Sequence, residues 1–234
     1  MKLLHLYYDL MNLYGEYGNV VVLNKHLEDQ GFEVILDKKS IGDEIDFEEY
    51  DFIYCGSGTE KNQKLALDDL LPRKKSLVKA IENNVVVLFT GNSMELLGKS
   101  IDNDEALDII SIKTKLTDNR YTGDVIVNNE EFGEVVGFVN KCSLIECLDD
   151  NKLFTYIFKD ANIKDNEYEG YRLNNLFGTH IIGPILVKNP NFMKTVIVLL
   201  GERNDKDFKY KEISYPFEED SYNVTLNALK QRIK

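Results

Sequence analysis

VVVLFTGNSMELLG, residues 85–98, decides the fold class of this 234-residue chain. Its opening run, Val85–Phe89, is apolar throughout and rich in β-branched residues, which is typical of a strand buried on both faces. A sheet built from such strands needs helices on both sides, so the stretch favours an α/β fold. The turn at Thr90 and Gly91 leads into a short helical segment. Strand, sharp turn and helix have the outline of a nucleophile elbow, which would expose the side chain of Thr90 at the edge of the sheet.

Strand and helix patterns alternate on the N-terminal side of this stretch. In chain order we expect a strand, a helix, two strands and a helical region at residues 2–8, 19–30, 32–36, 51–55 and 61–84. Gly31 is a natural end for the first helix, and Leu71-Pro72 should split the helical region into two pieces. Strands that alternate with helices indicate a parallel sheet covered by helices.

The second half of the chain has a less regular pattern. We expect further strands at residues 108–112, 120–127, 135–139, 154–158 and 176–182, and helices at residues 191–200 and 218–234. The sequence contains neither a low-complexity linker nor an internal repeat. A single domain over residues 1–234 is therefore the simplest organisation.

Composition excludes several classes of function. The 40 acidic residues outnumber the 28 basic ones, and the net charge of −12 argues against a nucleic-acid partner or an anionic membrane surface. No apolar run approaches the roughly 18 residues of a membrane span, and the N-terminus lacks the apolar core of a signal peptide. The cysteines, Cys55, Cys142 and Cys147, lack the spacing of a disulfide framework or zinc cluster. We therefore expect a cytoplasmic protein without a metal or cofactor on this chain.

Three loops should meet at the carboxyl edge of the sheet, where ligands of parallel sheets collect. They are residues 9–19, Gly56-Ser57-Gly58 and residues 90–92. A glycine-rich turn here can aim backbone N–H groups at developing negative charge, as an oxyanion hole does. The same glycines also fit a tight turn that only needs a positive φ. The spacing alone leaves both interpretations open.

Seven short stretches, in order over about residues 6–200, carry a family resemblance. They are residues 9–19, residues 56–58 with Gln63, Gly91 with residues 96–98, Arg120 with Gly123, residues 137–140, residues 169–170, and residues 178–186 with 188–190. Together they resemble the class I glutamine amidotransferases of the cobyric-acid-synthase-like (CobB/CobQ-like) branch. The resemblance is greatest to the GatD-type glutaminase subunits of lipid II isoglutaminyl synthase.

This resemblance implies a flavodoxin-like three-layer α/β sandwich with a mostly parallel central sheet, followed by a helical extension at residues 201–234. It also implies a role in peptidoglycan biosynthesis. The expected partner is an ATP-dependent Mur-ligase-like subunit of the MurT type, which forms a heterodimer with the amidotransferase and receives ammonia from it.

The resemblance also suggests site residues, and the catalytic ones are replaced. The substrate-binding positions are Arg120, which corresponds to the contact with the glutamine carboxylate, and Gly56, Ser57, Gly58, Gly91 and Asn140. The family nucleophile is a cysteine, and Thr90 holds that position; the family base is a histidine, and Ile182 holds that position. Val139 and Lys141 replace a further acid and a further histidine of the family pattern.

These replacements predict a catalytically silent protein. A missing general base costs on the order of 10²–10⁴-fold, and loss of a nucleophile on the order of 10⁶-fold. We expect a binding or scaffold subunit that docks on the ligase-like partner or holds glutamine uncleaved. One alternative is an active glutaminase, supplying ammonia for amidation of lipid II or of a cobyric-acid-type substrate through an unrecognised nucleophile. The other is an unrelated α/β binding module.

Two residues could in principle rescue catalysis. His180 lies two residues before Ile182 on the same predicted strand, displaced by about 6–7 Å. Cys55 is the thiol nearest the glycine loop in sequence. A hydrogen-bonded strand histidine and a small buried cysteine are the simpler interpretations.

Overall fold

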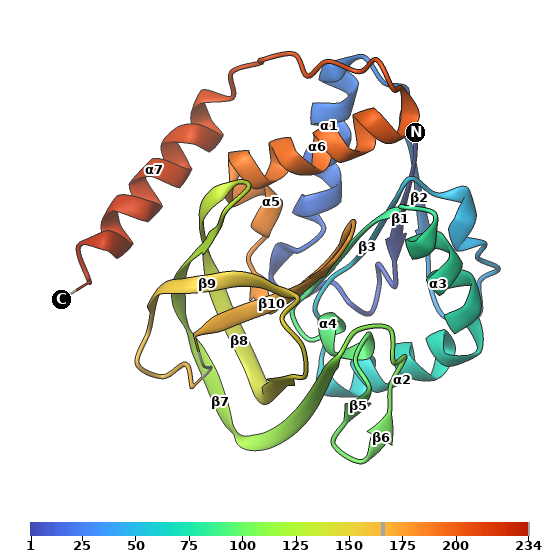
Figure 1. The fold of residues 1–234 in the computed structure, drawn as a ribbon, viewed down its shortest axis with the longest axis vertical. Helices are drawn as coiled ribbons and strands as arrows, with labels where there is room; N and C mark the ends of the chain where they lie inside the picture. Colours follow the sequence, from blue (N-terminus) through green and yellow to red (C-terminus); the bar gives the residue numbers. More distant parts are fainter. Residues whose placement is uncertain (165–166, 234) are drawn as a thin grey trace.

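The computed structural model describes residues 1–164 and 167–233 and arranges them around one continuous sheet (Figure 1). One half of the sheet is parallel, and its strands lie in the order β2 (Ile35–Lys39), β1 (Lys2–Leu6), β3 (Phe52–Cys55), β4 (Val86–Thr90) and β11 (Leu176–Thr179). These strands carry the predicted buried apolar runs, and β4 is fully buried from end to end.

The other half of the sheet is antiparallel. It continues from β11 through β10 (Tyr168–Leu173), β9 (Lys152–Lys159), β7 (Ile112–Asn129), β8 (Gly133–Cys147) and β12 (Ile181–Ile182). Two short strands, β5 (Ser100–Ile101) and β6 (Asp104–Glu105), pair beside β7. The long β7–β8 hairpin is closed by a tight turn, which requires antiparallel pairing. The α/β class is confirmed, but the parallel arrangement is confined to the first half.

Helices cover both faces of the parallel half, which gives the three-layer sandwich (Figure 1). The helices are α1 (Gly18–Gln30), α2 (Glu60–Leu70), α3 (Lys74–Glu82), α4 (Ser93–Leu96), α5 (Ile185–Lys188), α6 (Pro190–Asn204) and α7 (Pro216–Lys230). Alternate residues of β4 enter separate cores. Val87 and Phe89 pack in the cluster that includes α2 and α3, whereas Val86 and Leu88 pack in the cluster that includes α1 and α6.

Local signals for helix ends are confirmed. Gly31 follows α1 in the left-handed conformation with φ 100°, where a glycine is least strained. The break at Leu71-Pro72 is a short 3-10 turn, Leu71–Arg73, between α2 and α3.

Some predicted strands are misplaced. The strand expected at 32–36 begins at Ile35, because pairing with β1 sets its register and Phe32 and Val34 pack under α1 instead. Residues 108–111 form a turn ahead of β7, in which Asp108 has a positive φ of 46°. Strand β10 was not predicted at all.

The C-terminal region differs from the predicted extension at 201–234. Helix α6 continues to Asn204, an irregular connection follows, and α7 is a separate helix that ends at Lys230. Residue 234, with which the predicted helix ended, lies outside the described residues. None of the helices in the described part of the chain is long and apolar enough to cross a membrane.

Candidate functional site

The apex of the elbow is Gly91 rather than Thr90. Thr90 is still a strand residue, paired with Thr179 of β11, and it is Gly91 that has the positive φ, 63°. A β-branched residue avoids this conformation, while glycine adopts it without strain. The prediction that Thr90 occupies the apex is therefore wrong, and the position that would present a side chain at the edge of the sheet carries none.

The side chain of Thr90 points into the protein. It has no exposed surface, and its hydroxyl forms a short hydrogen bond to the carboxylate of Glu16. The same hydroxyl lies 2.8 Å from the hydroxyl of Tyr54. Thr90 thus belongs to a buried polar network beneath the carboxyl edge of the sheet.

Glu16 is the centre of this network and has no exposed surface. Its carboxylate accepts hydrogen bonds from the N–H of Gly183 at 2.7 Å and the hydroxyl of Tyr54 at 2.9 Å, besides that of Thr90. Burial raises the pKa of the Glu16 carboxyl, and these hydrogen bonds only partly oppose the rise. The network therefore ties the loop before α1 to the loop after β12. Sequence reasoning missed Glu16, although residues 9–19 had been selected.

The space over the apex is filled by Ser57 and Ile182. A Cβ atom added to Gly91 would lie 2.4 Å from Cβ of Ser57 and 3.2 Å from Cγ2 of Ile182. Ile182 therefore faces the apex of the elbow, as a base would, but with a hydrocarbon side chain that cannot accept a proton. A side chain at position 91 would overlap with Ser57.

The glycine loop is already hydrogen-bonded to the elbow. The side chain of Asn92 accepts from the N–H of Gly58 at 2.9 Å and donates to the carbonyl of Gly58 at 3.0 Å. This N–H was a candidate oxyanion donor, and it is in use within the chain. Both flanking glycines are sterically required, because a Cβ would lie 2.6 Å from the carbonyl oxygen of Met11 at Gly56 and 2.3 Å from its sulfur at Gly58.

Arg120 and Asn140 lie together, as the resemblance implied, and are paired within the chain. The guanidinium donates to the side-chain oxygen of Asn140 at 2.9 Å and to the carboxylate of Glu60 at 2.7 Å. Asn140 in turn donates to the hydroxyl of Tyr14 at 3.0 Å. Glu60, two residues beyond the glycine loop, thus provides Arg120 with a carboxylate partner from the same chain.

His180 is directed away from the elbow. Its Nε2 lies 3.0 Å from the carboxylate of Glu95, and its backbone N–H donates to Glu169 at 2.6 Å. Burial opposes protonation of the ring, but the hydrogen bonds to Glu169 and Glu95 outweigh it and raise the pKa of His180. The ring is held as a structural cation between two carboxylates, which sequence reasoning also missed.

Neither rescue residue completes a catalytic pair. Cys55 is buried, its closest sulfur contact is the carbonyl of Gly56 at 3.9 Å, and burial raises its pKa to about 12. A reactive thiol needs the opposite shift. Cys147 lines a cavity together with His180, but its sulfur lies 3.2 Å from the carbonyl of Asp149 and burial raises its pKa also.

With this geometry in hand, comparison with known proteins identifies the family. The sequence profile of the CobB/CobQ-like glutamine amidotransferase domain matches residues 2–190. The chain belongs to this family. It is also 33% identical over 218 residues to the subunit GatD of lipid II isoglutaminyl synthase (glutamine-hydrolyzing) from Streptococcus pneumoniae, over 89% of this chain and 84% of that protein. The corresponding subunit of Staphylococcus aureus is 29% identical over all of this chain and 98% of its own length.

Solved structures support the fold. A crystal structure of a glutamine amidotransferase superimposes with a TM-score of 0.55 at 13% identity, covering 85% of this chain and 98% of that one. A second, from Thermotoga maritima, superimposes with a TM-score of 0.53 at 10% identity, covering 99% and 97%. At such identities the likeness concerns the fold alone, and it confirms the flavodoxin-like class I amidotransferase architecture expected from the sequence.

Proposed function

We propose that this chain is a GatD-like subunit in peptidoglycan amidation that no longer hydrolyses glutamine and instead serves a ligase-like partner as a binding or scaffold subunit. The relatives are subunits of lipid II isoglutaminyl synthase by name, which supports assembly with another chain. The partner we propose is an ATP-dependent Mur-ligase-like protein of the MurT type. The unpaired cysteines of the described chain are compatible with a cytoplasmic complex.

The elbow is the observation that carries catalytic silence. Attack on an amide needs a nucleophile exposed at the turn and a base within hydrogen-bond reach. Here the turn residue is Gly91, and the side chain facing it is that of Ile182. The loop N–H that would stabilise an oxyanion is bonded to Asn92. Nucleophile, base and oxyanion donor are thus all withdrawn from the same spot.

Glutamine binding through Arg120 would require a rearrangement. The guanidinium is held by Glu60 and Asn140, so the carboxylate of a ligand must replace that of Glu60. Because the Arg120–Glu60 pair is half-exposed, its strength is modest, at roughly 0–1 kcal/mol. We therefore assign glutamine a secondary place, and docking on the partner the main one.

The test is co-expression with a Mur-ligase-like protein encoded by the same genome. We expect a stable pair by size-exclusion chromatography with light scattering. The pair should amidate its substrate when ammonium chloride is supplied, and should release no more glutamate from glutamine than the ligase-like protein alone. Failure to form a pair would contradict the scaffold role, and glutamate release above that background would contradict catalytic silence.

One observation favours an active glutaminase as the second candidate. The hydroxyl of Thr90 donates to a carboxylate, that of Glu16, and such a contact can in principle activate an alcohol. Against it, Thr90 has no exposed surface. Thr90→Val removes the hydroxyl at nearly constant shape, and Thr179→Val, at another buried threonine that bonds to a carboxylate, is the matched control. Glutamate release lost in the first variant and kept in the second would establish this alternative.

A further inference from the structure

A separate cavity lies between the β7–β8 hairpin and the strands β10 and β11, with a volume of about 430 Å³. This is within the usual range of small-molecule sites, roughly 300–1,000 Å³. Its lining includes neither the glycine loop nor Gly91, Arg120 or Ile182. The cavity is therefore distinct from the elbow, and what it binds is independent of the function proposed above.

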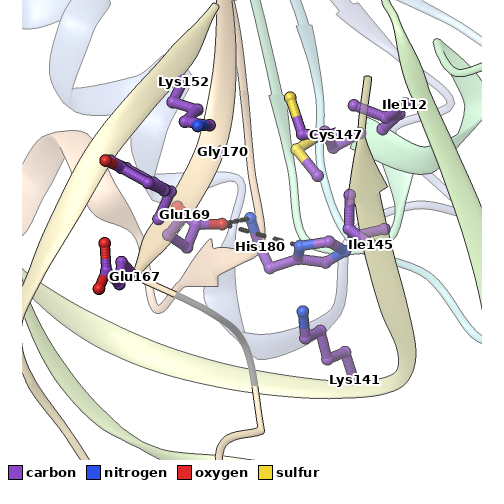
Figure 2. Close-up of a pocket in the computed structure, with 11 residues that line it drawn as sticks. Ile112, Lys141, Ile145, Cys147, Lys152, Glu167, Glu169, Gly170 and His180 are labelled. Carbon is purple, nitrogen blue, oxygen red and sulfur yellow. Dashed lines mark hydrogen bonds and ion pairs between the residues drawn. The ribbon is translucent and has the colours of Figure 1, made fainter. Parts of the chain in front are cut away.

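One wall of the cavity carries negative charge in fixed positions. Glu169 is buried, and its two oxygens accept from the N–H of His180 and the hydroxyl of Thr179, both at 2.6 Å. These bonds fix the carboxylate but leave each oxygen able to accept another. Glu167 stands two residues away on the same side and is exposed. Figure 2 shows both carboxylates on the β10 side of the cavity.

A buried cation closes one end. Lys141 lines the cavity with only 4% of its surface exposed, and in Figure 2 its ammonium points inward beneath His180. Charged groups placed around an internal space cost desolvation energy that apolar side chains would avoid. An arrangement of this kind is typical of binding sites, whose few polar groups fix the orientation of a ligand.

The opposite wall is aliphatic. Ile112 from β7 and Ile145 from β8 line it, and Figure 2 shows them across the cavity from Glu169. A ligand that fits must therefore carry a negative group, a positive group and a hydrocarbon part. A purely anionic ligand would face Glu167 and Glu169, and a purely cationic one would face Lys141.

We propose that this cavity binds a free α-amino acid with an aliphatic side chain. Its carboxylate would pair with Lys141 and its ammonium with Glu169 and Glu167. The side chain would pack against Ile112 and Ile145. An amino acid is the smallest molecule that satisfies all three walls at once.

The experiment titrates the whole chain, labelled with ¹³C at isoleucine methyl groups, with L-leucine. The methyl signals of Ile112 and Ile145 should shift and saturate with a Kd of about 1 mM or tighter. 4-Methylpentanoate lacks the ammonium and 3-methylbutylamine lacks the carboxylate. Each should bind at least about tenfold more weakly, since each loses one charge-assisted contact.

Two variants locate the site. Lys141→Met should weaken leucine at least about tenfold while leaving 3-methylbutylamine unchanged, and Lys113→Met, at an exposed lysine of β7, is the matched control. Ile145→Phe keeps every charge and should abolish binding by filling the cavity. An unchanged methyl signal of the distant Ile126 shows that each variant is folded.

Three outcomes would overturn the proposal: no saturable shift in the parent chain, equal affinity for the three probes, or undiminished leucine binding in Ile145→Phe. If Lys141→Met does not fold, Ile145→Phe decides alone. The glutamate assay reports on the elbow and the methyl titration on Ile112 and Ile145, so either proposal can fail without the other.

Discussion

At the scale of single residues, Glu16 bears the greatest structural demand. A buried carboxylate is tolerated only if its oxygens are satisfied, and here three donors from three parts of the chain meet it. Glu16→Ala would leave those donors unpaired, so we expect a loss of about 2–4 kcal/mol in the free energy of unfolding. Glu16→Gln, which keeps the shape, should cost much less. Urea unfolding of both variants measures the difference.

The pH dependence of Glu16 follows from the same burial. Its pKa in the folded protein is raised above the ordinary 4.5, so folding favours the protonated acid. The stability it contributes is complete below pH 4.5 and falls as the pH rises through the folded pKa. Glu16→Gln should remove this part of the pH profile, and an unchanged profile would show that Glu16 titrates normally.

Gly91 determines which substitutions could restore a nucleophile. The sequence suggests Thr90→Cys with Ile182→His, but the side chain at position 90 points to Glu16. We expect that pair to release no glutamate. Gly91→Cys with Ile182→His should also fail while Ser57 is present, because the new Cβ would lie 2.4 Å from that of Ser57. Adding Ser57→Gly should give measurable release, and activity in the Thr90→Cys pair would contradict this assignment of the apex.

His180 should add a pH dependence near neutrality. Its folded pKa is raised above 6.5 by Glu169 and Glu95, which outweigh burial and the repulsion from Lys141. Its contribution to stability is therefore complete below pH 6.5 and is lost as the pH rises through the folded pKa. His180→Gln should flatten the stability profile in that window, measured by thermal unfolding at a series of pH values. A variant that retained the original slope would exclude His180 as its source.

At the scale of elements, the sequence predicted what is encoded locally. Gly31 and Leu71-Pro72 act on their own neighbours, so the helix ends that depend on them were correct. Strand β10 was missed because its stability comes from pairing with β9 and β11, which are distant in sequence or turned by a left-handed residue, Asn174. Such pairing leaves no local periodicity to read.

The site divides in the same way. Arg120 and Asn140 could be placed together from the resemblance, and the structure joins them by a hydrogen bond. The role of Asn92 could not be foreseen, because its partner Gly58 is 34 residues away and the bond depends on a turn whose apex had been misplaced by one residue. Side-chain to backbone bonds of this kind are specified only by the folded geometry.

Two leucines measure how unequal the elements are. Leu88, on β4, is fully buried in the main core, whereas Leu229, on α7, belongs to a small cluster and keeps 6% exposure. Leu88→Ala should cost about 3–5 kcal/mol in unfolding free energy, and Leu229→Ala no more than about 2 kcal/mol, because the helix can settle into the smaller gap. Equal losses in denaturant unfolding would show that α7 is an integral part of the core.

At the scale of the whole molecule, the two halves of the sheet meet at β11, which pairs in parallel with β4 and antiparallel with β10. The strands around this junction are bonded on both sides, whereas β2 pairs with β1 alone and carries exposed residues. Amide hydrogen exchange should be slowest in β3, β4 and β11 and much faster in β2. Exchange of β4 at the rate of β2 would mean that the sheet opens as one unit.

The close approach of Ser57 to Gly91 also constrains how this loop can evolve. Only one of the two positions can carry a side chain, since the second Cβ would overlap with the first. A lineage with serine at 57 cannot regain a residue at 91 in one step, because the intermediate that holds both is strained. The route back passes first through glycine at 57, a change that brings no activity by itself. The loop therefore behaves as a ratchet, and descendants of this sequence are more easily selected for new contacts than for recovery of an old reaction.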